Sequence, residues 1–306
     1  MNDAPHVPVL RDESLELLQP GPGRRLVDGT FGFGGHSRLM AEAGAEVLGL
    51  DLDAVAHAAC LDLAGKYPGL CCQRISFRYL EQALKQQGWF RVDGVLLDLG
   101  VSSLQLDDPA KGFSYRADGP LDLRFNQDEG ASAADIIAGL KEKELADLIY
   151  RYGEERGSRR IARALVRARD EAPVATTARL REIVEGVLPR GAKAAPVLSR
   201  VFQALRIAAN AELEALEEVL QQLPRVLKPG GRFVIISYHS LEDRLVKRFI
   251  DREKKDCLCP PELPVCACDH KARLRPLTRR AVKASPAEEK SNPRSRSARL
   301  RAAQIL

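Results

Sequence analysis

The chain has 306 residues, 45% of them hydrophobic and 29% charged, with a formal net charge of +5 at pH 7. A chain of this length and composition forms about two globular domains with a sizeable core, and no apolar run reaches the roughly 18 residues of a membrane span. The first residues, MNDAPHVPVLRDE, lack the basic and apolar regions of a signal peptide, so we expect a cytoplasmic protein without a membrane partner.

Residues 24–53 carry the pattern around which the rest of the chain is organised: an apolar strand, a glycine-rich loop, a helix and a second strand. The first strand ends at Asp28, the loop follows it, and residues 36–43 are expected to form the helix. The second strand ends at Asp51, 19 residues beyond Gly32. This spacing predicts that the Asp51 carboxylate binds the ribose of a nucleoside-type cofactor above the loop.

Asp28 indicates which kind of cofactor the loop binds. A carboxylate here would repel the pyrophosphate of a dinucleotide, which prefers helix amides and positive potential. It suits a ligand with an ammonium and a sulfonium group, and S-adenosylmethionine has both as well as a ribose. We therefore predict an S-adenosylmethionine site; a plain tight turn in a doubly wound domain is the alternative.

The next segment is expected to alternate helix and strand. Residues 54–66 and 80–87 have helical patterns, and residues 70–77 form a third strand candidate between them. Phe77 at the end of that strand is placed to flank the base of the cofactor, although a core phenylalanine explains it equally well.

A fourth strand, residues 92–100, is a nearly continuous apolar run that carries Asp98 near its end. Because Asp98 ends a strand as the two earlier aspartates do, we expect all three carboxylates at one edge of the sheet. Ser102 and Gln105 follow as a polar rim of the same site or, alternatively, as a capped turn leading into a helix.

Helical periodicity replaces the strand pattern between residues 106 and 200. We interpret this stretch as a helical insertion, with candidate helices at residues 133–140, 143–152, 156–171 and 177–188. The third of them carries arginines spaced by three and four, which places on one face Arg156, Arg159, Arg160, Arg163 and Arg167. This face is either an ordinary solvated surface or a wall that contacts RNA phosphates.

The chain then returns to the sheet. One long helix is predicted for residues 197–226 and a fifth strand for residues 232–238, which delivers His239 to the edge that holds the aspartates. Methyl transfer is an in-line displacement, so the enzyme mainly positions donor and acceptor. Methylation of a pyrimidine carbon needs a cysteine nucleophile, and the segments around Asp98 and His239 contain none.

An exocyclic amine or a hydroxyl group therefore fits better as the methyl acceptor. We expect Asp98, a nearby backbone carbonyl or Ser102 to accept its hydrogen bonds, and His239, or water, to be the route by which the proton leaves.

Seven motifs in order resemble the bacterial small-subunit ribosomal RNA cytosine-N(4)-methyltransferase family: DGTFGFGGHS, LLDLGVSSLQLDD, GFSYRADGPLDLRF, YGEER, FQALRI, ISYHSLEDR and NPRSRSARLR. The resemblance runs from His6 to Arg301. It implies an α/β fold, a class I S-adenosylmethionine-dependent methyltransferase (Rossmann-like) domain with an inserted α-helical domain. It also implies S-adenosylmethionine as donor and a cytosine of the decoding region of 16S ribosomal RNA as acceptor. The expected boundaries are 1–105 and 201–306 for the methyltransferase domain and 106–200 for the insertion.

When the family's cofactor contacts are carried over by position, they fall on Gly34, Gly35, His36, Asp51, Phe77, Asp98 and Gln105. We add Asp28 to these contacts only because its negative charge suits the positively charged donor. One departure concerns the Pro-Pro-aromatic motif that many amino-methylating enzymes carry after the fourth strand. Leu99, Gly100 and Val101 stand there instead. The aromatic residue that stacks on the target base is therefore open, with the candidates Phe113, Tyr115 and Tyr238.

Seven cysteines, an odd number, favour free thiols or a metal site over a disulfide framework in a reducing compartment. Two CxC pairs lie close together near the C-terminus, and their four thiolates form a candidate tetrahedral zinc site: Cys257, Cys259, Cys266 and Cys268. Reduced thiols in a loop are the alternative, because CxC is a less usual ligand spacing than CxxC.

Positive charge is concentrated at the end of the chain. Residues 271–301 contain eleven lysines and arginines against two glutamates, which favours a polyanionic partner. We expect ribosomal RNA or the small ribosomal subunit, and no DNA. A dinucleotide-dependent oxidoreductase and a non-catalytic RNA chaperone are the rival functions; Asp28 disfavours the first.

Overall fold

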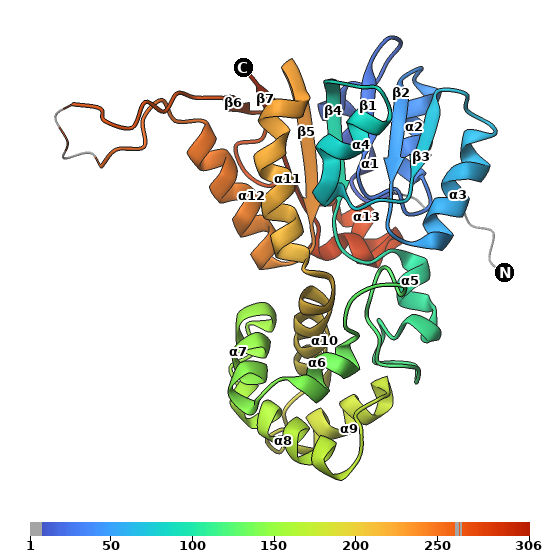
Figure 1. The fold of residues 1–306 in the computed structure, drawn as a ribbon, viewed down its shortest axis with the longest axis vertical. Coiled ribbons are helices and arrows are strands. Elements are labelled where there is room, and N and C mark those ends of the chain that lie inside the picture. Colours follow the sequence, from blue (N-terminus) through green and yellow to red (C-terminus); the bar gives the residue numbers. More distant parts are fainter. Residues whose placement is uncertain (1–7, 261–262, 264) are drawn as a thin grey trace. The chain divides into compact units, whose positions relative to one another are not determined.

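The computed structural model describes residues 8–260, 263 and 265–306, and these form two compact units (Figure 1). The first unit combines Met1–Gly100 with Leu213–Leu306, and the second is Val101–Glu212. The second unit is thus longer at both ends than the insertion expected at 106–200. His6, where the family resemblance starts, lies outside the described residues.

A seven-stranded sheet with the order β3-β2-β1-β4-β5-β7-β6 forms the centre of the first unit. Strands β1 to β5 are parallel, whereas β7 is antiparallel to both of its neighbours. The strands are β1 Arg25–Asp28, β2 Glu46–Leu50, β3 Leu70–Gln73, β4 Val92–Asp98, β5 Leu227–Ser237, β6 Leu274–Pro276 and β7 Arg299–Ile305.

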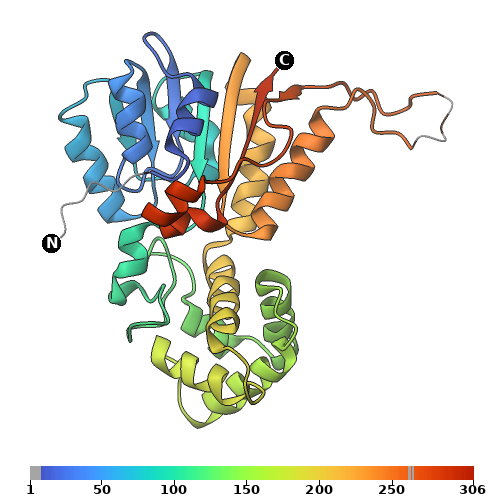
Figure 2. The same ribbon diagram turned by 180° about the vertical axis from the view of Figure 1, so that it is seen from behind.

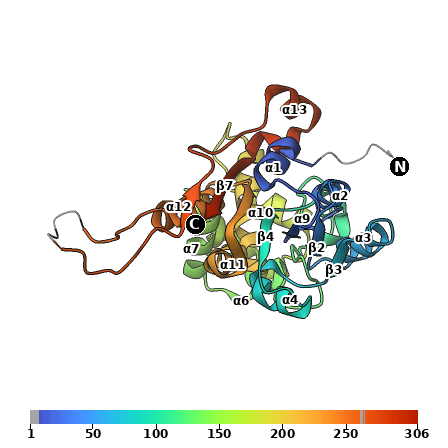
Figure 3. The same cartoon turned by 90° about the horizontal axis from the view of Figure 1, so that it is seen from above.

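Helices cover both faces of this sheet, with α4, α11 and α12 on one face and α1 and α2 on the other (Figure 3). Seen from behind, α13 lies beside the start of α1 (Figure 2), where the Glu288 carboxylate accepts a hydrogen bond of 2.8 Å from the Leu10 amide. The bounds are α1 Arg11–Leu18, α2 Gly35–Glu42, α3 Ala54–Ala64, η1 Phe77–Tyr79, α4 Leu80–Gln86, α11 Glu212–Val226, α12 Ser240–Glu253, α13 Pro286–Ser291 and η3 Pro293–Ser297.

The strands are apolar on both sides because each side packs against its own helices. Val27 and Leu97 belong to the core beneath α4, α11 and α12. Their neighbours Leu26 and Leu96 belong to the core beneath α1, α2 and α3. Successive side chains of a strand point to opposite faces, so a parallel strand covered on both sides reads as a continuous apolar run.

The second unit is helical and has a separate core that includes Leu145, Ile161 and Phe202. Its α8 buries Ile161, Ala162 and Leu165 on one side, which turns most of its arginines to the exterior. The bounds are α5 Ser103–Asp107, η2 Pro109–Lys111, α6 Ala133–Gly139, α7 Glu142–Gly153, α8 Ser158–Glu171, α9 Thr177–Gly186 and α10 Ala194–Asn210.

Three predicted elements differ in the structure. The fifth strand, expected at residues 232–238, begins five residues earlier and runs over Leu227–Ser237. The single long helix expected at 197–226 is wrong, because Ala211 adopts a left-handed conformation with φ of 47° and separates α10 from α11. The third strand is shorter than expected: it ends at Gln73, and Phe77 instead opens the 3-10 helix η1, where the Ser76 side chain accepts a hydrogen bond from the Arg78 amide.

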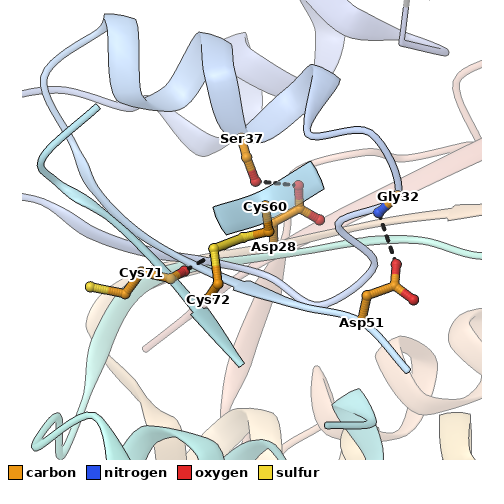
Figure 4. The surroundings of a disulfide bond; sticks show 7 residues. All are labelled: Asp28, Gly32, Ser37, Asp51, Cys60, Cys71 and Cys72. Atoms are coloured by element: carbon orange, nitrogen blue, oxygen red, sulfur yellow. Dashed lines mark hydrogen bonds between the residues drawn. A yellow bond between two sulfur atoms is a disulfide. The ribbon is translucent and has the colours of Figure 1, made fainter. Parts of the chain in front are cut away.

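Cys60 of α3 and Cys72 of β3 form a disulfide (Figure 4). This pairing corrects the expectation of free thiols or metal ligands alone. The five other cysteines are free. The disulfide ties a helix on one face of the sheet to an edge strand, two elements that the sequence pattern does not place side by side.

Within the part of the chain that the structure describes, no helix combines the length and the apolar character needed to span a bilayer.

Candidate active site

The first unit has a topological switch point between β1 and β4. β1 pairs with β2 on one side and with β4 on the other, so the chain crosses over in opposite directions from this point. In open parallel sheets, ligands bind at such a point, beyond the carboxyl ends of the strands. Asp28 ends β1 and Asp98 ends β4, which places both carboxylates at this point.

Asp28 is buried, with 1% of its surface exposed. Its carboxylate accepts hydrogen bonds from the Ser37 hydroxyl at 2.7 Å and from the Thr30 amide at 3.3 Å. Burial, aided by the nearby charge of Asp51, raises the pKa of Asp28 to about 6 against the effect of these hydrogen bonds. The protein around Asp28 therefore holds a negative charge that a cation would stabilise.

Asp51 follows β2 and fixes the glycine-rich loop. Its carboxylate accepts a hydrogen bond from the Gly32 amide at 2.8 Å (Figure 4) and another from the Asp53 amide at 2.9 Å. Burial raises the pKa of this carboxyl as well. Gly32 has a φ of +55°, and a Cβ built on it meets only the Thr30 carbonyl oxygen, at 4.0 Å, so the loop is open at this residue.

Asp98 forms the centre of the site together with Tyr238, the first residue after β5. The Tyr238 hydroxyl donates a hydrogen bond of 2.8 Å to the Asp98 carboxylate. The Asp98 amide donates one of 2.6 Å to the Thr30 hydroxyl, which ties the end of β4 to the glycine-rich loop. Burial raises the pKa of Asp98 to about 7, although the Tyr238 hydrogen bond lowers it.

Gly100 makes room for this arrangement. Its φ of +97° is a conformation that side chains rarely adopt, and a Cβ at this position would lie 3.3 Å from the Tyr238 ring. The positive φ favours glycine at this position, and the tyrosine ring packs against the backbone here.

His239 caps helix α12. Its Nδ1 accepts a hydrogen bond of 3.4 Å from the Glu242 amide, and Glu242 in turn accepts hydrogen bonds from the amides of Tyr238 and His239 at 2.9 and 3.2 Å. The His239 Nε2 lies 3.2 Å from the Glu242 carboxylate, and both side chains are buried. The structure thus gives His239 a capping function, and its part in removing a proton stays a prediction.

The residues that open α2 are held by packing within the first unit. Gly34 has a φ of +69°, and a Cβ there would lie 2.4 Å from the Phe31 ring, while a Cβ on Gly35 would lie 2.6 Å from Pro8. The buried His36 places its Nε2 3.2 Å from the Val9 carbonyl oxygen. Only glycine fits the first two positions, and their contact with a cofactor stays a prediction.

Phe77 lies beside the loop rather than at a strand end. A Cβ built on Gly29 would be 3.1 Å from the Phe77 Cβ, and the Phe77 ring packs against the core beneath α4. It is partly exposed, so it is available to a ligand as well as to the core.

Ser102 and Gln105 belong to the second unit, where they cap α5. The Gln105 side chain accepts a hydrogen bond of 3.0 Å from the Ser102 amide, and the Ser102 hydroxyl accepts one of 3.3 Å from the Gln105 amide. The capped turn that the sequence left as an alternative is therefore present. Their roles toward acceptor and cofactor stay predictions.

Two of the candidate stacking aromatics also belong to the second unit. Phe113 stacks on Phe125 with 5.6 Å between ring centroids, and the Tyr115 hydroxyl lies 3.3 Å from that of Ser199. Phe113 is buried. The third candidate, Tyr238, is engaged with Asp98.

Sequence reasoning assigned no role to Thr30, Ser37 or Glu242, and it named Tyr238 only for stacking. All four were recognisable as polar residues in the glycine-rich loop, in the following helix or after β5. The pattern does not tell which carboxylate each one contacts, because that depends on the register between strands.

The arginines form two groups in the structure. Most of those in and next to α8 are exposed: Arg156 just before the helix and, within it, Arg159, Arg160, Arg163 and Arg167. Arg169 is partly buried and donates hydrogen bonds to the carbonyl oxygens of Ile137 and Leu140. Near the C-terminus, several are held by internal partners, since Arg299 and Arg301 both contact Asp243 and Arg273 contacts the fully buried Glu253. The C-terminal charge is thus partly structural, which reduces the number of cations available to a polyanion.

Comparison with known proteins adds evolutionary evidence to this geometry. A family model described as the MraW methylase family matches residues 3–306. The chain belongs to the MraW methylase family.

Curated members of the family cover this chain almost completely. It is 49% identical over 306 residues to "Ribosomal RNA small subunit methyltransferase H" of Thermomicrobium roseum, with 98% of this chain and 94% of that protein aligned. A protein of the same name from Anaeromyxobacter sp. (strain K) is 49% identical, with 99% of each chain aligned. The family resemblance inferred from the motifs is therefore confirmed.

Solved structures are more distant in sequence. The crystal structure of a putative rRNA-methylase from Clostridium thermocellum aligns with 98% of this chain and 100% of its own, at 10% identity and a TM-score of 0.45. SMU.1697c of Streptococcus mutans, a putative methyltransferase in complex with SAH, aligns at 8% identity, over 98% of this chain and 100% of its own, with a TM-score of 0.44. The sheet order and the family together confirm the expected fold class, a class I methyltransferase domain.

Proposed function

We propose that this chain transfers the methyl group of S-adenosylmethionine to the exocyclic N4 amine of a cytosine in the decoding region of small-subunit (16S) ribosomal RNA. Membership of the MraW methylase family and the names of the curated relatives support this activity. The observation that carries it is the pair of strand-end carboxylates, Asp28 and Asp98, at the switch point of the sheet, whose pKa values are raised to about 6 and about 7.

The carboxylates fit the charge of the donor. Asp28, Asp51 and Asp98 all have raised pKa values because burial disfavours their ionised forms. A ligand with an ammonium and a sulfonium group would offset this electrostatic cost, whereas a pyrophosphate would increase it. When bound, S-adenosylmethionine supplies an electrophilic methyl group on a positively charged sulfur. Asp51 also holds the Gly32 amide, so it sets the shape of the loop that the nucleoside contacts.

Asp98 and Tyr238 would align the acceptor. The Asp98 carboxylate has one hydrogen bond from Tyr238 and further lone pairs with which to accept an N–H of the cytosine amine. A fixed acceptor turns the nitrogen lone pair toward the methyl group, and this positioning is the main demand of an in-line displacement. The proton of the product amine then passes to Asp98 or to solvent.

The RNA partner would bind through phosphates. The exposed arginines of α8 present a cationic face on the second unit, and guanidinium groups bind phosphates with two hydrogen bonds at a time. Exposed cations between β6 and β7 add to this on the first unit, among them Arg279, Arg280 and Lys283. The proposed partner is the small ribosomal subunit or its RNA, in the cytoplasm.

The test measures methyl transfer from labelled S-adenosylmethionine to purified small subunits and to naked ribosomal RNA, followed by nucleoside analysis for N4-methylcytidine. Asp98→Asn keeps the size of the side chain and removes its charge, so we expect a loss of about a hundredfold or more. Asp62→Asn on the exposed side of α3 is the matched control and should retain full activity. Equal activity in both variants would refute the assignment of the site.

The rival functions give different results in the same preparation. A dinucleotide-dependent oxidoreductase would bind a nicotinamide dinucleotide tightly and S-adenosylmethionine not at all. A chaperone would bind the RNA and leave it unmodified in every variant.

A further inference from the structure

The segment between α12 and β6 extends away from the rest of the first unit and then returns, so that it has two adjacent limbs: an outgoing limb after α12 and a returning limb before β6 (Figure 1). Its outgoing limb carries Cys257 and Cys259, and its returning limb carries Cys266 and Cys268. The ligand atoms of these four cysteines all lie within 4.8 Å of one another. The active site described above uses none of them.

The spacing of the sulfur atoms matches a tetrahedral metal site. Cys257 Sγ lies 3.4 Å from Cys266 Sγ and 3.7 Å from Cys268 Sγ, and the last two are 3.6 Å apart. A zinc ion with Zn–S bonds of about 2.3 Å holds its sulfur ligands about 3.8 Å from each other. These three thiols thus already have nearly the separations that zinc imposes, and the Cys259 sulfur lies within 4.8 Å of them.

Backbone amides point at the sulfur atoms from both limbs. The Leu258 amide on the outgoing limb donates to Cys268 Sγ at 3.2 Å, and the Ala267 amide on the returning limb donates to Cys259 Sγ at 3.3 Å. The Cys259 amide donates to Cys257 Sγ at 3.3 Å. Such N–H···S hydrogen bonds stabilise negative charge on sulfur, which a ligating thiolate carries.

The two limbs have no apolar core that would hold them together. The large apolar side chains described there are exposed: Leu258 by 36%, Leu263 by 50% and Val265 by 76%. No helix or strand lies between α12 and β6 among the residues that the structure describes. A short segment without a core usually depends on a cross-link or a metal for a defined structure.

We propose that Cys257, Cys259, Cys266 and Cys268 bind one zinc ion that joins the two limbs of this segment. Four thiolates in tetrahedral geometry, without an open position for water, are the ligand set of a structural rather than a catalytic zinc. Each thiol releases its proton to solvent when it binds the metal. The site is independent of the proposed methyl transfer, since its residues are separate from the strand-end carboxylates.

The experiment determines metal content in the full-length protein, expressed in zinc-supplemented medium and purified under reducing conditions. We expect about one equivalent of zinc per chain by elemental analysis, and its loss in Cys259→Ser and in Cys268→Ser. Cys71→Ser is the matched control, because Cys71 is a free cysteine outside the cluster, and it should keep its zinc.

Two further measurements keep the outcome interpretable. Binding of S-adenosylmethionine at wild-type affinity in the zinc-free variants would show that the first unit is folded. Trypsin should cleave after Lys254, Lys255 and Lys271 faster once the zinc is removed, since all three are exposed on the limbs. Less than about a tenth of an equivalent of zinc in the wild type, or native masses that show disulfides within the cluster under these conditions, would overturn the proposal.

Discussion

At the scale of single residues, burial and the opposing hydrogen bond from Tyr238 determine the pKa of Asp98. The pKa of Asp98 is raised to about 7 by burial, and the Tyr238 hydroxyl opposes this effect. If the ionised carboxylate aligns the acceptor, methyl transfer increases as the pH rises through about 7 and decreases about tenfold per pH unit below it.

Tyr238→Phe should move this pH profile to higher pH. The variant keeps the ring that packs on Gly100 but loses the hydroxyl, so the pKa of Asp98 rises further and a smaller fraction of the carboxyl is ionised at a given pH. The rate of methyl transfer at pH values on both sides of neutrality is the measurement. Tyr115→Phe in the second unit is the control, and a profile of Tyr238→Phe that coincides with it would contradict the role of the hydroxyl.

The raised pKa of Asp98 also predicts how stability depends on pH. The folded state binds the Asp98 proton more tightly than the unfolded state, so the free energy of unfolding decreases as the pH rises from about 4 to about 7 and stays reduced above that. Asp98→Asn removes this effect, and we expect it to raise the free energy of unfolding by about 1–3 kcal/mol at about pH 8, with little change at about pH 4.

Urea denaturation without cofactor measures this change at both pH values. Asp62→Asn, whose side chain is exposed, serves as the control. A destabilised Asp98→Asn variant at the higher pH would contradict the claim that ionised Asp98 is electrostatically unfavourable in the cofactor-free protein.

At the scale of secondary-structure elements, the break between α10 and α11 depends on a residue that is poorly suited to it. Ala211 has a φ of 47°, and its Cβ costs about 1–2 kcal/mol in a left-handed conformation. Ala211→Gly should therefore stabilise the protein by about 0.5–1 kcal/mol, after allowance for the greater freedom of glycine in the unfolded chain.

Ala208→Gly, three residues earlier and inside α10, is the matched control. It should destabilise by about 1 kcal/mol, because the same substitution in a helix interior lowers helix propensity. Thermal or urea unfolding measures both, and equal effects of the two substitutions would contradict the proposed cost at Ala211.

The arginine face of α8 should contribute to RNA affinity and not to donor binding. Replacing Arg159, Arg160 and Arg167 with alanine removes three exposed cations while preserving helix propensity. We expect weaker binding of small-subunit RNA, with the slope of log Kd against log salt reduced by about one for each phosphate that the protein no longer neutralises.

A triple variant with the same charge change on the first unit serves as the control: Lys66→Ala, Lys85→Ala and Arg91→Ala. Filter binding over a range of salt concentrations compares the two, and calorimetry should find unchanged affinity for S-adenosylmethionine in both. An equal loss of RNA binding in the two variants would mean that only total charge matters.

Much of the element order was predictable, because parallel strands covered on both faces have a strong local signal. Strands β1 and β4 end at the expected aspartates, and β2 ends one residue before Asp51, since an apolar run that stops at an acid marks the edge of the sheet. The site was predictable only in part. Tyr238 contacts Asp98 because β5 pairs with β4 in a particular register, and no local pattern specifies that register.

The missed disulfide has a similar cause. Cys60 and Cys72 lie on a helix and on a strand, and the neighbouring Cys71 is one residue closer to Cys60 in sequence. Which of the two pairs with Cys60 depends on the direction that each side chain takes from β3, because successive strand residues point to opposite faces. The helix break at Ala211 was missed because alanine is the strongest helix former and gives no signal for a turn.

At the scale of the whole molecule, the two units have separate cores, and the single tryptophan reports on one of them. Trp89 is 7% exposed in the core of the first unit, and the Arg25 guanidinium lies 5.2 Å from the centre of its ring. Addition of S-adenosylmethionine at about 100 times its Kd should stabilise the first unit by about 2.7 kcal/mol.

Thermal unfolding followed by tryptophan fluorescence should therefore shift upward with the donor. Far-UV circular dichroism reports the helices of both units, so it should show, besides the transition of the first unit, a second transition that shifts less with the donor. Coincident transitions at every donor concentration would show that the two units unfold together.

The discontinuity of the first unit also determines the order in which the nascent chain can fold. The ribosome completes β4 and then synthesises Val101–Glu212 before β5, which pairs with β4, emerges. At about 5–20 residues per second this delay is on the order of 10 s. During this time the edge of β4 that pairs with β5 has no partner strand. The helical unit is contiguous and completes its own core within that interval, whereas the sheet is finished only after β7, the final strand of the chain, has been translated.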